Sequence, residues 1–167
     1  LDEIKKKFED AGYYLSGKLL NASDYGVPQD RKRIIFVGFR KDLDIKEFNY
    51  PEPTTLLSNE KRTLKDCIFD LKDSALPAKV RNYSNGKLET LNHEYMIGGF
   101  SSMYMSRNRV RTWDKPSFTI QAGGRHAPIH PQAPEMIKIE NDKREFVKGK
   151  EDRYRRLSVR ECARIQT

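Results

Sequence analysis

One segment sets the expected architecture, Tyr25-Gly-Val-Pro-Gln-Asp-Arg-Lys-Arg-Ile-Ile-Phe-Val-Gly38. Its second half is a compact run of β-branched and aromatic residues, Ile34 to Gly38, and this run suits a central strand of a sheet. Gly26 and Pro28 predict a turn before the strand. The polar run from Gln29 to Arg33 therefore falls at a strand end, where α/β folds commonly carry their binding groups.

The residues before this segment predict a short helix followed by another strand. Leu1, Ile4, Phe8 and Ala11 recur at helical spacing, and Gly12 ends the pattern. Tyr13 to Leu20 then has the composition of a strand. A helix, a strand, a polar loop and a second strand together indicate the edge of an α/β sheet.

After Lys41 the pattern becomes irregular. Proline and Asn-Gly or Gly-Gly pairs interrupt short segments, and only Leu64 to Leu71 has helical spacing, with Thr63 as a candidate N-cap. Phe118 and Ile120 alternate with polar residues before a flexible Ala-Gly-Gly. We therefore expect a small, irregular module with short strands.

The last residues predict a helix with a well-marked start. Ser158-Val-Arg-Glu161 is a capping box, and Leu157 is spaced to pack against Cys162, so the helix begins at Val159. Because the sequence ends after barely two turns of this helix, and the first helix also begins abruptly, we expect the chain to be part of a longer protein.

The charge of the chain is basic and unevenly distributed. The 167 residues include 32 Lys and Arg against 24 Asp and Glu, a formal charge of +8. Residues 42–100 have a net charge of −2, whereas residues 1–41, 101–142 and 143–167 have +3, +2 and +5. The basic segments contain arginine clusters at 31–33, 107–111 and 153–160, and arginine suits bidentate contacts to phosphate or guanine. A nucleic-acid partner is favoured over a merely solvated surface.

Several other classes of protein are disfavoured. No apolar run is long enough for a membrane span, and no signal-peptide core is present, so we expect a soluble, cytoplasmic protein. Cys67 and Cys162 are too few for a disulfide framework and indicate free thiols in a reducing compartment. His93, His126 and His130 lack ligand spacing, so no metal site is expected.

Three segments resemble motifs of the DNA cytosine-5 methyltransferases, in the family's order. Gln29, Arg31 and Arg33 match the Gln-x-Arg-x-Arg run of its eighth motif. Residues 111–124 resemble the ninth motif, which organises the target-recognition domain, and residues 156–167 resemble the segment that precedes the tenth motif. The resemblance is closer to bacterial enzymes that modify GGCC in restriction-modification systems, through the segments 93–98, 105–113 and 130–134.

The resemblance implies a division of the chain into three parts. Residues 1–41 would be C-terminal strands of the catalytic domain, at the edge of its Rossmann-like sheet. Residues 42–150 would be a small, irregular, mainly β target-recognition domain, and residues 151–167 would begin the helix that returns to the catalytic domain. The family's Pro-Cys nucleophile motif, Glu-Asn-Val motif and Gly-rich S-adenosylmethionine motif do not occur here. We therefore expect the chain alone to be inactive and the S-adenosylmethionine site to lie outside it.

The resemblance also assigns roles to individual residues. The family flips a cytosine out of the duplex, adds a cysteine thiolate at C6 and transfers a methyl group to C5. Arg33 matches the arginine that donates to the pyrimidine edge, with Gln29 and Arg31 in supporting positions. Arg107, Arg109 and Arg125 match guanine readers. Arg111 is either another DNA contact or a cation–π partner of Trp113, and Arg155 either meets phosphates or solvates a hinge.

The partners implied are double-stranded DNA and, functionally, a cognate restriction endonuclease, with the enzyme acting as a monomer. Two alternatives remain open at this point. One is a basic DNA- or RNA-binding module without enzymatic activity. The other is a restriction nuclease, which ranks last because the acidic residues of 42–100 are scattered among lysines rather than clustered for metal binding.

Overall fold

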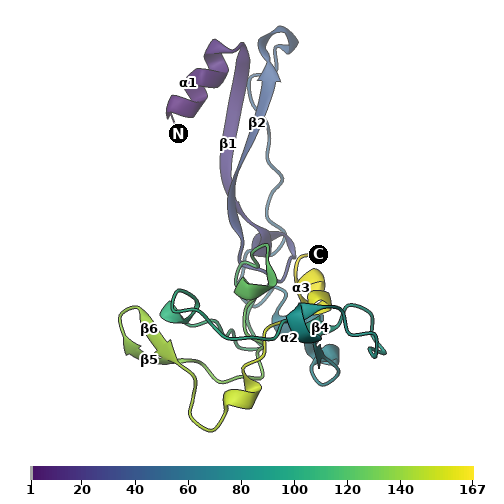
Figure 1. Cartoon of the computed structure of the whole chain (residues 1–167). Helices are drawn as coiled ribbons and strands as arrows, with labels where there is room; N and C mark the ends of the chain where they lie inside the picture. Colours follow the sequence, from purple (N-terminus) through teal and green to yellow (C-terminus); the bar gives the residue numbers. More distant parts are fainter. Residues whose placement is uncertain (1) are drawn as a thin grey trace.

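A long β-hairpin extends from a broader, irregular body in the computed structural model, which describes residues 2–167 (Figure 1). The helix α1 (Asp2–Asp10) ends at Gly12, whose φ of 87° few other residues adopt. Strand β1 (Tyr13–Asn21) then pairs antiparallel with β2 (Lys32–Arg40), from Tyr13 opposite Arg40 to Asn21 opposite Lys32. The helix and both strands agree with the sequence prediction; Leu1 lies outside the described residues.

Strand β2 does not lie at the centre of a sheet within the described chain. It pairs with β1 alone, and its residues Ile34 and Ile35 are 46% and 43% exposed, while Leu19 of β1 is 61% exposed. The expectation of a central strand is therefore not met by these residues. A place at the edge of a Rossmann-like sheet stays a prediction.

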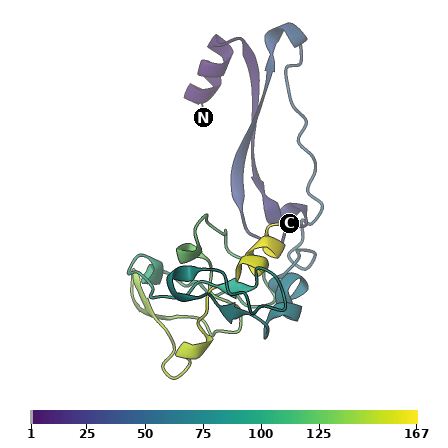
Figure 2. The ribbon, with the colours of Figure 1, turned by 45° about the vertical axis from the view of Figure 1, so that its right-hand side comes forward.

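The segment that follows the hairpin runs back along it toward the body (Figure 2). The Phe48 amide donates to Ser16 Oγ at 2.9 Å, and the Tyr50 hydroxyl donates to the Ile35 carbonyl at 2.8 Å. Near the body, the Tyr25 hydroxyl donates to the Pro51 carbonyl at 3.0 Å. These contacts hold the returning chain against the hairpin.

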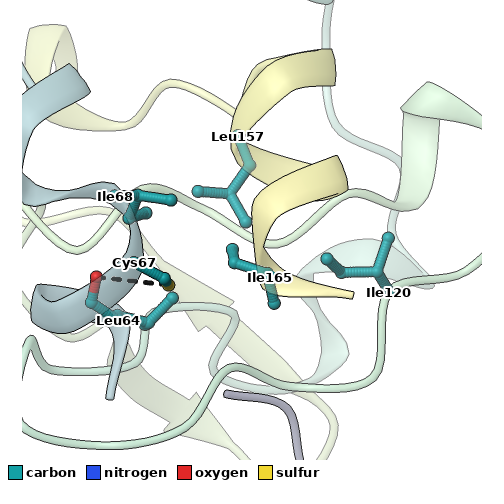
Figure 3. Close-up of a cluster of buried hydrophobic side chains, with 6 residues drawn as sticks. All are labelled: Leu64, Cys67, Ile68, Ile120, Leu157 and Ile165. Carbon is teal, nitrogen blue, oxygen red and sulfur yellow. Dashed lines mark hydrogen bonds between the residues drawn. The ribbon is translucent and has the colours of Figure 1, made fainter. Parts of the chain in front are cut away.

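Two short helices form one core of the body. Helix α2 (Leu64–Ile68) begins at a capping box of Thr63 and Asp66, and α3 (Val159–Ile165) begins at the capping box of Ser158 and Glu161, as the sequence predicts. The buried side chains of this core come from three distant parts of the chain (Figure 3). The buried members are Leu64, Cys67, Ile68, Ile120, Leu157 and Ile165.

A second core supports the rest of the body. It consists of Tyr104, Val110, Ile129, Ala133, Met136 and Tyr154.

The body also contains two short strand pairs. Strands β3 (Leu76–Pro77) and β4 (Glu94–Tyr95) pair in parallel, and β5 (Ile137–Glu140) and β6 (Lys143–Glu145) pair antiparallel.

The body is irregular, as predicted, and it contains less strand than the expected mainly β module. Its strands are two to four residues long, and 3-10 turns and loops connect them. The alternating segment 116–121 forms a single bridge, from Ser117 to Gln29, rather than a regular strand. The chain is therefore a mixed α/β structure with small sheets. Because both cores draw residues from 42–150 and from 151–167, the expected division there stays a prediction.

Candidate functional site

The loop that enters β2 is joined to the segment around residue 118. The Asp30 amide donates to the Ser117 carbonyl at 2.9 Å, and the Ser117 amide donates to the Pro28 carbonyl at 2.9 Å. Thr119 Oγ1 also donates to the Asp30 carbonyl at 2.6 Å. Two segments about 90 residues apart are thereby fixed side by side, and both belong to motifs that the sequence singled out.

Gln29 and Arg31 flank Asp30 and lie partly inside this junction. The side chain of Gln29 is buried, and its Nε2 has no hydrogen-bond partner among the described residues. The Arg31 guanidinium donates to the Ile120 carbonyl at 3.5 Å, and its backbone amide donates to Asn21 Oδ1 at 2.8 Å. Both residues are therefore held by the junction.

Arg33 lies on the exposed start of β2. Its guanidinium donates to the neighbouring Lys32 carbonyl at 2.7 Å. This contact leaves most of its five N–H donors unused, so Arg33 keeps donors for an external partner.

Three of the predicted DNA-binding arginines share a cleft with Asp30. The volume of this cleft is about 260 Å³. The lining includes Arg107, Arg109, Arg111 and Gln121. Within the described lining, Asp30 is the one carboxylate among these arginines. The cleft is therefore suited to an anionic or guanine-rich ligand.

Arg109 is held firmly within this cleft. Its Nε donates to the Tyr104 carbonyl at 2.8 Å, and a terminal nitrogen donates to the Met103 carbonyl at 3.2 Å. Its guanidinium also lies 4.6 Å from the centre of the Tyr104 ring. Burial lowers the pKa of Arg109, with Arg107 adding to the effect, but a guanidinium stays charged at neutral pH. The neighbouring Arg107 is exposed.

Arg111 stacks on a different ring from the one that the sequence offered as an alternative. Its guanidinium lies 4.2 Å from the centre of the Phe118 ring and donates to Asp30 Oδ2 at 3.1 Å. Of the two alternatives for Arg111, the cation–π pair with Trp113 is wrong, because the indole packs edge-on against Phe69 and His130 instead. Trp113 is only two residues from Arg111 in the sequence, which suggested it as the stacking partner. In the structure its indole packs against the first core instead.

Arg125 lies beside a second cleft, of about 500 Å³, which Gly98, Gly99 and Arg156 also line. Arg156 is 3% exposed and donates to the carbonyls of Gly98, Gly99 and Arg125 at 3.1, 2.8 and 3.4 Å. It also lies 4.0 Å from the centre of the Phe100 ring. Arg156 therefore positions the backbone of Arg125, a role that the sequence did not reveal.

The two glycines before Arg125 have local reasons to be glycine. Gly123 has a φ of 103°, which strains other residues. A Cβ on Gly124 would lie 3.0 Å from the Met96 sulfur. A side chain at Gly124 would therefore have to displace the side chain of Met96.

Arg155 is occupied by a buried ion pair. Its side chain is 8% exposed, and its two terminal nitrogens donate to both carboxylate oxygens of Glu161 at 2.8 Å each. Burial alone would raise the pKa of Glu161, but the hydrogen bonds from Arg155 hold that pKa below its usual value. The geometry favours a structural role for Arg155. The capping box pointed to Glu161, but its pairing with Arg155 depends on the tertiary fold.

The rings of His93 and His130 make hydrogen bonds within the fold. His93 is buried between Ser158 Oγ and the Leu71 carbonyl, at 2.7 and 2.9 Å. His130 is also buried, and burial, together with the nearby Arg155, lowers its pKa to about 3. Among residues 2–167, no three His, Cys, Asp or Glu side chains are grouped so that they could hold a metal ion.

Neither cysteine has the properties of a nucleophile. Burial raises the pKa of Cys67 to about 11 and that of Cys162 to about 12, so both stay protonated at neutral pH. Both are free thiols; Cys67 is buried, and Cys162 is half-buried.

A membrane-spanning helix would have to be longer and more apolar than any helix among residues 2–167.

These features define an arginine-lined site at the junction of two motif segments, of the kind that contacts nucleic acid. The sequence profile of C-5 cytosine-specific DNA methylases matches residues 1–167. The chain belongs to this family.

The chain is also similar to three named type II methyltransferases. It is 56% identical to M.FnuDI of Fusobacterium nucleatum, 59% identical to M.MthTI of Methanothermobacter thermautotrophicus and 48% identical to M.NgoPII of Neisseria gonorrhoeae. These alignments cover 98–99% of this chain and 47%, 50% and 48% of the relatives. The chain therefore spans about half the length of the curated relatives it matches.

Proposed function

We propose that this chain is the DNA-recognition part of a DNA cytosine-5 methyltransferase of a type II restriction-modification system. In this proposal, the longer protein transfers a methyl group to C5 of a flipped cytosine, and the chain supplies sequence recognition and a donor to the target base. The cleft that brings Arg107, Arg109 and Arg111 together beside Asp30 is the observation that carries it. Family membership and the type II relatives support the class of reaction.

The recognition step follows from arginine chemistry. A guanidinium donates two parallel hydrogen bonds to O6 and N7 of guanine in the major groove, and a good pair contributes about 1–3 kcal/mol of discrimination. Arg107 and Arg109 in the first cleft and Arg125 beside the second would read guanines in this way. Three such readers fit a site made only of G·C pairs, so we propose a GGCC-like target.

The chemical step needs a donor at the pyrimidine edge. When a thiolate adds to C6 of cytosine, negative charge develops on the ring, and a fixed donor stabilises it. Arg33 keeps donors free for this purpose. Gln29 and Arg31, which the junction holds, would fix the loop that presents Arg33.

S-adenosylmethionine does not fit the described clefts. It supplies the methyl group as a positively charged sulfonium, which the arginines of both clefts would repel. The carboxylate of the first cleft, Asp30, is already paired with Arg111. We therefore place the S-adenosylmethionine site and the nucleophilic cysteine in the rest of the longer protein, and expect the chain alone not to transfer methyl groups.

The proposal includes partners as well. Double-stranded DNA is the substrate, the enzyme acts as a monomer, and a restriction endonuclease that cleaves the same unmethylated sequence accompanies it. The +8 charge of the chain suits binding to duplex DNA, with an affinity that falls as salt rises.

Methyl transfer by the full-length protein tests this function. The protein is incubated with S-adenosylmethionine and a duplex that contains GGCC, and 5-methylcytosine is measured by mass spectrometry. We expect methylation of the duplex and none of a matched RNA. DNA binding without any methyl transfer would instead favour a basic DNA-binding module, and methylation of adenine would contradict the proposal.

A further inference from the structure

Asp30 is an unexpected residue in its surroundings. It lines a cleft with Arg107, Arg109 and Arg111, in a chain with a net charge of +8. A carboxylate repels the phosphates of DNA, so its presence here requires a role that outweighs this repulsion.

The side chain of Asp30 links two parts of the site. One carboxylate oxygen, Oδ1, accepts from Ser23 Oγ at 3.1 Å and from Asn21 Nδ2 at 3.4 Å, both next to the hairpin end. The other oxygen, Oδ2, accepts from Arg111 at 3.1 Å. The carboxylate therefore ties Arg111 to the hairpin that presents Arg33.

The backbone of Asp30 strengthens the same link. Its amide and carbonyl bind Ser117 and Thr119, on either side of Phe118. The Phe118 ring covers one face of the Arg111 guanidinium at 4.2 Å. Asp30 thus fixes both the edge of Arg111 and the ring on which it stacks.

This arrangement gives Arg111 a different task from its neighbours. The ion pair with Asp30 and the Phe118 ring leave the Arg111 side chain 28% exposed, and the Asp30 side chain is 35% exposed. Such a partly buried, charge-assisted contact restricts the guanidinium to one orientation. Arg107 is exposed, and Arg109 is held by backbone carbonyls of its own segment.

We propose that Asp30 is a positioning residue that acts through Arg111, and that the Asp30–Arg111 pair sets the placement of the recognition cleft relative to the Gln29–Arg33 loop. This inference rests on the proposed function. It assigns guanine reading in the cleft to Arg107 and Arg109. Arg111 instead holds the cleft in place against the Gln29–Arg33 loop through its contact with Asp30.

A double-mutant cycle in the full-length protein tests the pair. The quantity measured is the ratio of kcat/KM for a GGCC duplex to that for a duplex in which one G·C pair is replaced by A·T. Asp30→Ala and Arg111→Ala are each expected to lower this ratio by about tenfold, and the double variant by the same tenfold, because the two residues act as one unit. A hundredfold loss in the double variant, or equal slowing on both duplexes, would overturn the proposal.

Asp70→Ala is the control. Asp70 forms an ion pair with Arg164 at 2.7 Å, its side chain is 63% exposed, and it does not line the cleft. Its removal is expected to leave the ratio unchanged. If Asp30→Ala fails to fold, as thermal unfolding would show, the same cycle is run with Asp30→Asn, which preserves the volume of the side chain.

The wild-type protein separates this proposal from the proposed function. If it forms no 5-methylcytosine, the proposed function fails, and the cycle is then measured as the ratio of Kd values for the same two duplexes by fluorescence anisotropy. If it methylates DNA but the effects of the two substitutions multiply, only the positioning role of Asp30 is wrong.

Discussion

The hairpin and the body of this chain differ in how they use their apolar residues. The hairpin exposes Ile34, Ile35 and Leu19, although its sequence has the composition of a buried strand. The body buries two apolar clusters beneath short, irregular segments. The hairpin is therefore held by the pairing of its two strands and by the returning segment, whereas the body is held by side-chain packing and buried polar contacts.

The difference also separates the proposed roles. Arg33 lies on the hairpin, and the arginines of the recognition cleft belong to the body. Asp30 and the 117–119 segment join the two regions. Substitution of the cleft arginines should therefore affect DNA choice, whereas substitution of Arg33 should affect turnover.

The largest effect is expected for the buried ion pair of the body. Arg155→Ala leaves the Glu161 carboxylate buried without its partner, and this should lower the free energy of unfolding by about 3–5 kcal/mol. Denaturant unfolding measures the change. Arg153→Ala, at an exposed position nearby, is the control and should change stability by less than about 0.5 kcal/mol. Equal, small effects would mean that the Arg155 pair does not stabilise the body.

The next largest effect belongs to the hairpin. In the full-length protein, Arg33→Ala should lower kcat by about 10²–10³-fold, because it removes a donor to the charge that develops on the target base. DNA affinity should change by less than about tenfold. Arg40→Ala, at the far end of the same strand, provides the control. If Arg33→Ala weakens binding more than turnover, Arg33 is a phosphate contact instead.

The body should also show a pH-dependent stability that comes from His130. Burial lowers the pKa of His130 to about 3, so between this value and the ordinary pKa near 6.5 the unfolded chain binds a proton that the folded chain does not. Stability should therefore fall as the pH decreases below about 6.5, by up to about 1.4 kcal/mol per pH unit.

Unfolding measured between pH 7 and pH 5 checks this expectation. His130→Gln should flatten the dependence, whereas His126→Gln, at an exposed position, should leave it unchanged. An unchanged slope in His130→Gln would show that another group is responsible.

The smallest effect is expected on the exposed face of the hairpin. Ile35→Ala should lower the stability of the chain by less than about 1 kcal/mol, because the side chain is already 43% exposed. Ile68→Ala, in the first core, should cost about 2–5 kcal/mol. Denaturant unfolding of both variants compares the two regions. Equal losses would contradict the difference between hairpin and body.

Local signals in the sequence predicted the regular elements well. The apolar spacing of the first residues, the strand composition around Ile34 and the two capping boxes each depend on neighbours within a few residues. The sequence predicted short strands in the body but not which segments pair, because β3, β4 and the single bridges join residues that are distant in the sequence.

The site was predictable only in part. The spacing of Gln29, Arg31 and Arg33 could be recognised from the sequence, but the burial of Arg155 and the pairing of Arg111 with Asp30 depend on tertiary contacts. Asp30 lies between Gln29 and Arg31 in the Gln-x-Arg-x-Arg run. Neighbouring residues, however, do not reveal whether such a carboxylate is solvated or binds an arginine 81 residues away.

The central claim is that the arginine cleft reads G·C pairs in duplex DNA. Base discrimination by Arg109 is the most direct test of this claim. The full-length wild-type protein and its Arg109→Ala variant are compared by kcat/KM on a GGCC duplex and on duplexes with one G·C pair replaced. We predict that the variant loses about 1–3 kcal/mol of discrimination at one position of the site and little at the others. An equal loss of kcat/KM on every duplex would contradict base reading by this cleft.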